Sequence, residues 1–497
     1  MNRKTGFCFL ALVLLLLSLV GCGTTAPPET QPPTEDPNLK VVEYTLTAEK
    51  EEDLLVLADY PNLQRVDLRG SSCYEAIMAY MEAHPQVQVQ YDVKIGNTLY
   101  QFDMQELTLE DGTFDAAQLL ENLKFLPQLQ KLELPRTSLD ANILTQLNEL
   151  YPDLEIGYTV LILEQEVSGN VTELDLSGLL PEQVETVCPE IAKLGNLTDI
   201  YLMDGEGKSA LGMTDVKLLM DAVPETNVHY SFKLFGQTLT TMDERVEYVK
   251  NYFGNEGVEQ IRQALDILPK CTYLLMDRCN VSNEVMAQLR DDYPDVKVVW
   301  RIYFDKYNCL TDVTVFQCVE TLHDGNSKQI KYCTDVVYLD IGHSYNLSDL
   351  SFVSYMPNLK VAIVADCYTK TLEPFAACKN LQWLEIVNCN RVTDLSPLAN
   401  CTNLRGVNMS YTFTIDDLSP LYGLEHLERL FLGRHDLPQE EIDAVRAALP
   451  NCWVTDESWD VAWIGFNYSV GWRLDDEHTF ADWYLEIKEV FGYTREI

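Results

Sequence analysis

The residue types that most often carry catalysis or metal binding are present in this chain, but their spacing fits neither role. The seven histidines are scattered, and no C-x-x-C, H-x-x-x-H or H-E-x-x-H motif occurs. The acidic runs Asp291-Asp292 and Asp475-Asp476-Glu477 lack the glycine turn and spaced oxygens of a calcium loop. No G-x-S-x-G elbow or phosphate-cradling glycine loop occurs in a convincing setting. We therefore expect no catalytic residues, no metal and no cofactor.

Most of the cysteines occupy positions typical of buried apolar residues. Cys378 and Cys401 stand at a repeated position that Met356 and Leu424 fill elsewhere, which marks a small buried hydrophobe rather than a ligand. We expect free thiols there. Twelve of the fourteen cysteines remain once the two N-terminal ones are set aside, an even number that keeps a disulfide framework open. The candidates for such bonds are the three cysteines that we place outside the repeat: Cys309, Cys318 and Cys333.

The charge of the chain excludes one large class of partners. Its 497 residues include 77 acidic and 36 basic side chains, which gives a formal net charge of −41. Such a field repels phosphate backbones and anionic lipid surfaces, so we expect no nucleic-acid partner. The acidic residues are spread along the whole chain, which indicates a solvated surface rather than an acidic tail.

The elements that position the remaining candidates come from a sequence repeat. Pairs of apolar residues with one residue between them recur at steps of 22 or 23 residues, followed each time by two further apolar positions. One such coil cannot bury its own apolar face, so a period of 20 to 29 residues predicts stacked coils. The pairs are Leu339-x-Ile341, Ala362-x-Val364, Leu384-x-Ile386, Val407-x-Met409 and Leu430-x-Leu432.

This pattern resembles a leucine-rich repeat solenoid. The L-S-P-L phrases at 395–398 and 418–421 resemble the short coils of internalin-like bacterial surface proteins. The resemblance implies an α/β fold with a parallel β-sheet on the concave face and helices or short turns on the convex face. We expect short coils over 335–452 and an irregular junction over 305–334.

Longer coils are expected over 39–304. There the same apolar pairs alternate with helical patterns at 116–123, 143–150 and 258–268. Every second coil ends in a proline followed by a strictly alternating strand with an aromatic residue in a fixed place. These inserted strands begin at 89, 156, 228 and 298, about 70 residues apart, which indicates a duplicated two-coil unit.

The N-terminus has the pattern of an export signal. A basic start is followed by an apolar run over 7–20 that is too short to span a bilayer comfortably. Leu19-Val20-Gly21-Cys22 resembles the lipobox of bacterial lipoproteins, which implies a signal peptide over 1–21 and acylation of Cys22. We expect a proline- and threonine-rich tether over 22–38 and a lipid-anchored protein that faces the outside of the cell. A plain secretory signal with an incidental Cys22 is the alternative.

Residues 453–497 are expected to form a C-terminal cap. Five of the seven tryptophans lie there: Trp453, Trp459, Trp463, Trp472 and Trp483. The last coil of a solenoid needs a cover, although aromatic platforms for sugar rings are an alternative. Tyr484, Ile487 and Phe491 predict a final amphipathic helix.

The candidate ligand site lies in the outward positions of the short coils. Residues flanking each apolar pair point to the concave face; they are charged in the first coils and apolar further on. Exposed apolar surface is costly, so we expect either a ligand or the chain's own tail or an inserted strand to cover it. The predicted groove is centred on Tyr338, Trp383 and Phe431, with Asp340, Glu385, Asn408 and Arg429 as polar neighbours.

The sequence therefore predicts a non-catalytic cell-surface protein that binds an extracellular protein or glycan through the concave face. One alternative is an envelope scaffold or structural lipoprotein whose concave face is occluded. A carbohydrate-active enzyme is the third possibility, because a catalytic group can be assembled from distant positions.

Overall fold

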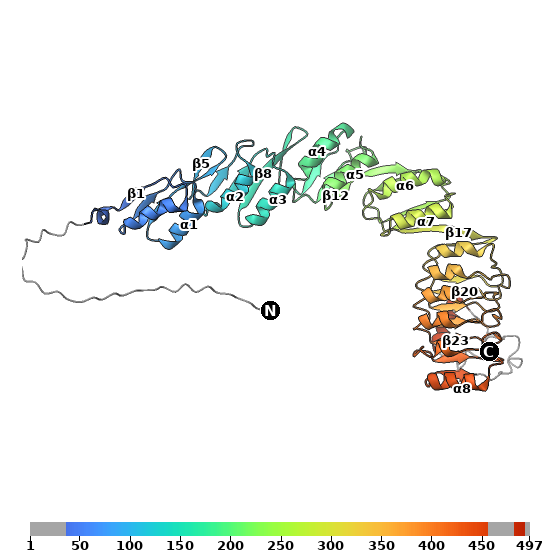
Figure 1. Ribbon diagram of the computed structural model, residues 1–497. Coiled ribbons are helices and arrows are strands. Elements are labelled where there is room, and N and C mark those ends of the chain that lie inside the picture. Colours follow the sequence, from blue (N-terminus) through green and yellow to red (C-terminus); the bar gives the residue numbers. More distant parts are fainter. Residues whose placement is uncertain (1–35, 456–481, 493–497) are drawn as a thin grey trace, which may run out of the picture. The chain divides into compact units, whose positions relative to one another are not determined.

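The computed structural model describes residues 36–455 and 482–492. It separates the chain into two compact units, Met1–Thr159 and Val160–Ile497, and the division falls inside strand β8 (Glu155–Ile162). Both units are built from short strands that alternate with helices or turns (Figure 1). This mixed α/β content with parallel sheets fits the leucine-rich repeat fold.

Two parallel sheets form the first unit. Strands β1, β2 and β3 pair in chain order, and so do β6, β7 and the start of β8. Strands β4 and β5 form an antiparallel hairpin. The strands are β1 (Glu43–Thr45), β2 (Arg65–Asp67), β3 (Gln88–Gln90), β4 (Asp92–Ile95), β5 (Thr98–Gln101), β6 (Glu106–Thr108) and β7 (Lys131–Leu134). The helices are α1 (Tyr74–Ala83), α2 (Ala116–Asn122) and α3 (Ala141–Leu150).

The same design recurs twice at the start of the second unit. Strands β10 to β12 are parallel and are followed by the hairpin β13–β14, while β15 to β17 are parallel and β17 continues into a hairpin with β18. The strands are β9 (Gln165–Ser168), β10 (Glu173–Asp175), β11 (Asp199–Tyr201), β12 (Asn227–His229), β13 (Ser231–Leu234), β14 (Gln237–Thr240), β15 (Arg245–Val249), β16 (Tyr273–Asp277), β17 (Lys297–Phe304) and β18 (Tyr307–Leu310). The helices are α4 (Val184–Ile191), α5 (Met213–Ala222), α6 (Val258–Leu265) and α7 (Asn283–Asp292).

The inserted strands predicted from the sequence are the points where a chain segment leaves a parallel sheet. Each of the four continues beyond its sheet and is followed by a partner strand, β5, β9, β14 or β18. Their aligned aromatic residues are buried, because alternation gives each strand one apolar face. These residues are Tyr91, Tyr158, Tyr230 and Trp300.

A seven-stranded parallel sheet closes the second unit, with its strands paired in chain order. Its coils are short because 3₁₀ turns replace helices between most of the strands. A proline is the second residue of three of these turns, η8, η9 and η10. The strands are β19 (Val315–Gln317), β20 (Tyr338–Asp340), β21 (Val361–Ile363), β22 (Trp383–Glu385), β23 (Gly406–Asn408), β24 (Arg429–Phe431) and β25 (Trp453–Thr455). The turns are η6 (Ser327–Tyr332), η7 (Ser351–Tyr355), η8 (Glu373–Ala377), η9 (Ser396–Asn400) and η10 (Ser419–Leu421). Helices α8 (Gln439–Ala448) and α9 (Asp482–Phe491) complete the described chain.

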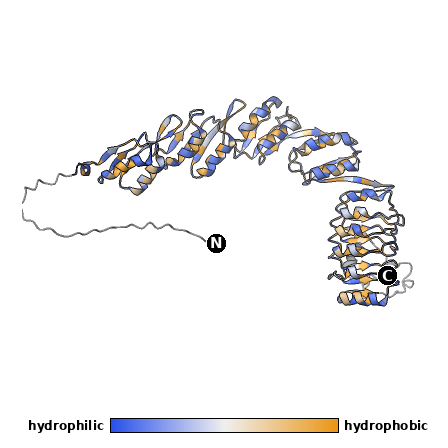
Figure 2. Ribbon diagram, in the orientation of Figure 1, coloured by the Kyte–Doolittle hydropathy of each residue, from blue (hydrophilic) through white to orange (hydrophobic). Residues whose placement is uncertain are grey.

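The apolar columns of the repeat form the core of this sheet. Leu339, Leu384 and Leu430 at the strand centres are fully buried, as are the two leucine columns that follow them. Apolar residues recur along both units and are interleaved with polar ones (Figure 2). Among the described residues, no helix combines the length and apolar character needed to cross a membrane.

The structure differs from the sequence prediction at both ends of the short coils. Segment 305–334 is not irregular, because it contains β18, β19 and η6, and Phe316 and Cys318 fill the apolar pair of the first short coil. Cys333 follows η6 as Met356 follows η7, so it also belongs to a repeat column. At the other end Trp453 begins β25, the seventh parallel strand, rather than lying in a separate cap.

Candidate functional site

All seven residues of the predicted groove lie on one face of the C-terminal sheet. The parallel register aligns Tyr338, Trp383 and Arg429 in one row of outward positions. The next row aligns Asp340 and Glu385 with two further residues, Asn408 and Phe431. The sequence repeat therefore brings residues almost a hundred positions apart to one surface, as the coil period predicts.

Helix α9 lies on this surface. Its Ile487 and Phe491 are 2% and 6% exposed and pack with Val361, Trp383 and Phe431 in one apolar cluster. Trp383 and Phe431 are each only 2% exposed as a result. The predicted groove is therefore filled by the chain's own C-terminal helix, which is one of the three covers that the sequence left open.

A polar contact fixes the edge of the helix. The hydroxyl of Tyr338 donates to Oε1 of Glu486, and the Tyr338 ring meets Phe491 edge-on at 6.3 Å between centroids. Burial, together with the Glu486 carboxylate, raises the pKa of Tyr338 to about 12. A cavity of about 20 Å³, the size of one water, remains beside Lys360 and Arg405. The helix therefore leaves no room for a further ligand at this position.

The polar residues of the groove bond within the sheet. Oδ1 of Asp340 accepts the backbone N–H of Gly342 at 3.1 Å, and Oε1 of Glu385 accepts Nε1 of Trp383 at 3.0 Å. Asn408 is fully buried, and its Nδ2 has no hydrogen-bond partner among the residues that the structure describes. The two buried carboxylates thus orient a turn and an indole, which is a structural role.

Glycine at position 406 makes the packing of Trp383 possible. The two residues are partners in neighbouring strands, and a Cβ atom at 406 would lie 1.6 Å from Cζ3 of the indole. The indole therefore lies against the bare backbone of β23. A side chain at this position would push the ring toward helix α9.

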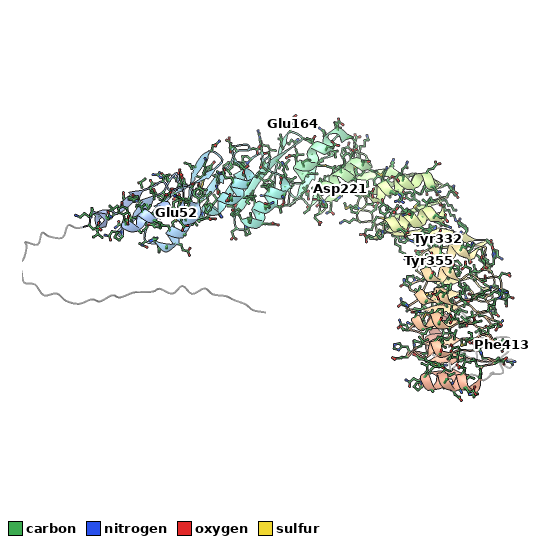
Figure 3. The ribbon with its side chains drawn as sticks, viewed as in Figure 1. Glu52, Glu164, Asp221, Tyr332, Tyr355 and Phe413 are labelled. Carbon is green, nitrogen blue, oxygen red and sulfur yellow. The ribbon has the colours of Figure 1, made fainter. Side chains whose placement is uncertain are left out.

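An open cleft of about 610 Å³ lies elsewhere in the second unit, at the ends of strands β15 to β17. Tyr252 and Tyr303 at its edge are 67% and 51% exposed. Tyr332 of turn η6 is labelled in Figure 3. Its hydroxyl donates to Oε1 of the lining residue Glu284 at 3.2 Å. The cleft is also lined by Arg278, Asn283, Arg301 and Gln329.

Hydrogen bonds hold the floor of this cleft in place. Nε and Nη2 of Arg301 donate to the two carboxylate oxygens of the buried Asp277 at 2.7 and 2.9 Å, and this pair lowers the pKa of Asp277. Nε1 of Trp300 donates to Asn283 at 2.9 Å, and Asn283 donates to Gln329 at 2.7 Å. A rigid polar floor with exposed tyrosines at its rim suits a binding site.

Sequence reasoning missed this cleft. Its lining comes from the segment after β15, from the end of β16 and the chain that follows it into α7, from β17 and from η6, and none of these carries a motif. The one available signal was the outward register of Tyr303 in the alternating strand, opposite to the buried Phe304.

Several predicted features lie outside the described residues. These are the anchor Cys22 and three tryptophans of the tail, Trp459, Trp463 and Trp472. Within 36–455 and 482–492, no three histidine, cysteine or acidic side chains are grouped as a metal site would need.

Comparison with known proteins identifies the repeats of the C-terminal sheet. The family model "Leucine Rich repeats (2 copies)" matches residues 379–423, which span β22 and β23. No curated protein matches the chain.

Solved structures with similarity to the chain include three bacterial proteins. An internalin from Listeria monocytogenes is 16% identical, with 74% of this chain and 88% of that chain covered and a TM-score of 0.26. Internalin C2 from the same organism is 17% identical over 56% of this chain and 91% of that chain, with a TM-score of 0.25. A leucine-rich repeat protein of Leptospira interrogans is 14% identical over 84% and 96%, also with a TM-score of 0.25.

Proposed function

We propose that this protein is a non-catalytic, lipid-anchored recognition protein with a leucine-rich repeat solenoid that binds an extracellular protein partner. The matched repeats indicate a role in protein interaction. The single observation that carries the proposal is the open cleft at β15 to β17, with two exposed tyrosines and Arg278 at its rim. Tyrosine and arginine are enriched at the energetic centres of protein interfaces. A glycan partner is the alternative occupant.

The concave face of the C-terminal sheet serves a partner only after helix α9 leaves it. Trp383 and Phe431 are buried beneath Ile487 and Phe491, so a ligand for the predicted groove must compete with the helix. Competition of this kind lowers the apparent affinity by the fraction of molecules in which the face is free. The cleft carries no such cost.

The test is a binding screen of soluble chain from Asn38 to Ile497 against proteins of neighbouring cells and a glycan panel, at varied salt. We expect a protein hit that weakens at least tenfold in the double variant Tyr252→Ala and Tyr303→Ala, because a tyrosine that anchors a partner contributes about 2 kcal/mol or more to binding. Tyr355→Ala is the matched control: this tyrosine is 53% exposed and lies on turn η7, but it is not one of the residues that line the cleft. If the double variant binds the partner with unchanged affinity, the cleft is not the binding site. If a glycan binds instead and the double variant weakens it, the cleft is the site but the partner is a glycan.

A third variant separates the two surfaces. Replacing Ile487 and Phe491 by alanine weakens the cover over the concave face without touching the cleft. A partner of the concave face should bind more tightly to this variant, whereas a partner of the cleft should bind equally well.

An envelope scaffold is the second candidate function, and the occupied concave face favours it. A scaffold needs no free groove, and the apolar outward residues of the short coils are already covered. If neither the protein screen nor the glycan screen gives a hit, and α9 stays docked on the C-terminal sheet without any ligand, the result would favour a scaffold over a recognition protein.

The proposed location has its own test. Acylation of Cys22 predicts that the full chain partitions with membranes and carries lipid on its first mature residue. Mass spectrometry of the N-terminal peptide, compared with the Cys22→Ser variant, would measure this. If the Cys22→Ser chain is soluble, the result supports the lipid anchor. If the wild-type chain carries no lipid, the result refutes it.

A further inference from the structure

Two cysteines from different elements meet in the second unit. Cys309 lies in strand β18, opposite Ile302 of β17, and is partly exposed. Cys333 directly follows turn η6 and is fully buried. Their Sγ atoms are 3.8 Å apart, which is van der Waals contact between two sulfurs.

Three of the five other buried thiols of the short coils illustrate their different surroundings. Cys389 and Cys401 donate to the backbone carbonyls of Val364 and Phe375 at 3.3 and 3.2 Å. Cys318 directly follows β19 and is buried at the second apolar position of the first short coil. These three have the environments of small buried hydrophobes.

We propose that Cys309 and Cys333 are joined by a disulfide bond in the functional protein. Sulfurs already in contact reach bonding distance through small side-chain movements. The bond closes the segment 309–333, which contains β19 and η6, and ties the β17–β18 hairpin to the first short coil. An oxidising compartment is required, so in this one respect the inference rests on the proposed location.

The two thiols have the unequal character that disulfide exchange needs. The hydrogen bond between them lowers the pKa of Cys309, with help from the nearby Arg301, while that bond and burial raise the pKa of Cys333. Cys309 is therefore the attacking thiolate and is the more accessible of the two.

The reaction balances with a disulfide oxidant, such as the disulfide of an oxidoreductase. The Cys309 thiolate attacks one sulfur of the oxidant, whose own S–S bond breaks and releases a thiolate. Sγ of Cys333 then loses its proton and attacks Sγ of Cys309, which releases the second thiolate. Two protons go to the two departing thiolates, so the protein dithiol is oxidised by two electrons and the oxidant is reduced to two thiols.

The bond would also stabilise the cleft. Arg301 and Tyr303 come from β17, whereas Gln329 comes from η6, and the disulfide links the elements that carry these two walls. Its existence does not depend on whether a partner uses the cleft.

The experiment is differential alkylation of the full chain taken from membranes of expressing cells. The chain is denatured with one alkylating reagent present, then reduced and treated with a second reagent of different mass. We expect Cys318, Cys389 and Cys401 to carry the first reagent, and Cys309 and Cys333 to carry only the second, with their peptides linked before reduction. Free thiols at 309 and 333, or a Cys309–Cys318 link, would overturn the proposal.

Two further measurements keep the result interpretable. Reduction should lower the Tm of the wild-type chain by about 5 °C, since the bond closes a loop of about 25 residues, but should not change that of the double variant Cys309→Ala and Cys333→Ala. Equal shifts in both chains contradict the proposal. If the thiols are free in cells, the purified chain is equilibrated in a glutathione redox buffer to find the cause. A disulfide that forms in the buffer means that the proposed location was wrong. No disulfide in the buffer means that the proposed pairing of Cys309 with Cys333 was wrong.

Discussion

The double substitution Ile487→Ala and Phe491→Ala should release helix α9 from the C-terminal sheet. Both side chains are almost completely buried against Trp383 and Phe431. Full burial of a side chain of this size contributes about 1.5–3 kcal/mol, so the pair contributes about 3–6 kcal/mol to docking. A helix of ten residues has marginal stability by itself in water, so these contacts must also offset the cost of ordering it.

Truncation to alanine removes most of this contribution. A loss of about 3 kcal/mol changes the equilibrium between docked and free helix by a factor of roughly 150. The loss of free energy cannot exceed the docking free energy of the helix, because an undocked helix has no further contacts with the sheet to lose. The seven-stranded sheet keeps its columns of buried leucines and should remain folded.

Hydrogen exchange detected by mass spectrometry measures both effects in one experiment. We expect amides of the segment 482–492 to lose protection by two orders of magnitude or more, while those of β20 to β24 keep most of theirs. Glu489→Ala is the matched control, because this residue lies on the same helix but is exposed. Unchanged protection of 482–492 in the double variant would refute the assignment of Ile487 and Phe491 as the anchors.

Three further predictions concern single residues. Gly406→Ala places a Cβ atom 1.6 Å from the Trp383 ring and should cost about 1–3 kcal/mol of unfolding free energy in chemical denaturation; an unchanged midpoint would contradict the packing. Arg301→Met removes both hydrogen bonds from the guanidinium to the buried Asp277 carboxylate, which keeps only the 3.8 Å contact with Arg278, and should cost about 2–4 kcal/mol of unfolding free energy. Because Asp277 has a lowered pKa in the folded chain, its pairing with Arg301 stabilises the fold above the ordinary aspartate pKa, and this stabilisation is lost as the pH falls through the lowered value. The stability of the Arg301→Met variant should therefore lack this dependence on acidic pH. Tyr338 has a raised pKa, so its contribution to α9 docking is complete below the ordinary tyrosine pKa of about 10 and is lost as pH rises toward 12; Tyr338→Phe should remove this alkaline dependence of hydrogen exchange.

The strands could be predicted because the same pattern of apolar residues recurs independently in each coil. Leu384 and Leu430 mark buried strand centres with the same spacing, and neighbouring coils confirm the register. The first short coil was missed where that pattern weakens: Phe316 and Cys318 occupy the paired positions in place of leucine. Burial of Cys333 follows from the same column, so its place outside the repeat was a wrong prediction.

The two surfaces that bear on function could not be predicted in the same way. The cleft is assembled from four segments, and the burial of Asp277 beneath Arg301 depends on the pairing of β16 with β17 rather than on either strand alone. Helix α9 was predicted as an amphipathic helix, yet its docking surface lies more than fifty residues earlier in the chain. Periodicity shows that a face is apolar, but it does not show which other apolar face covers it.

Because helix α9 covers this face of the C-terminal sheet, the apolar residues in its outward positions have a structural explanation. In water, Val361, Trp383 and Phe431 need a cover, and a ten-residue helix with two buried anchors supplies one without any ligand. Apolar character at these positions is therefore explained by the fold itself and carries no separate information about a partner. The exposed Tyr252 and Tyr303 have no such explanation, since the described chain leaves them in solvent. For that reason the cleft, rather than the groove predicted from the sequence, is where a partner should be sought first.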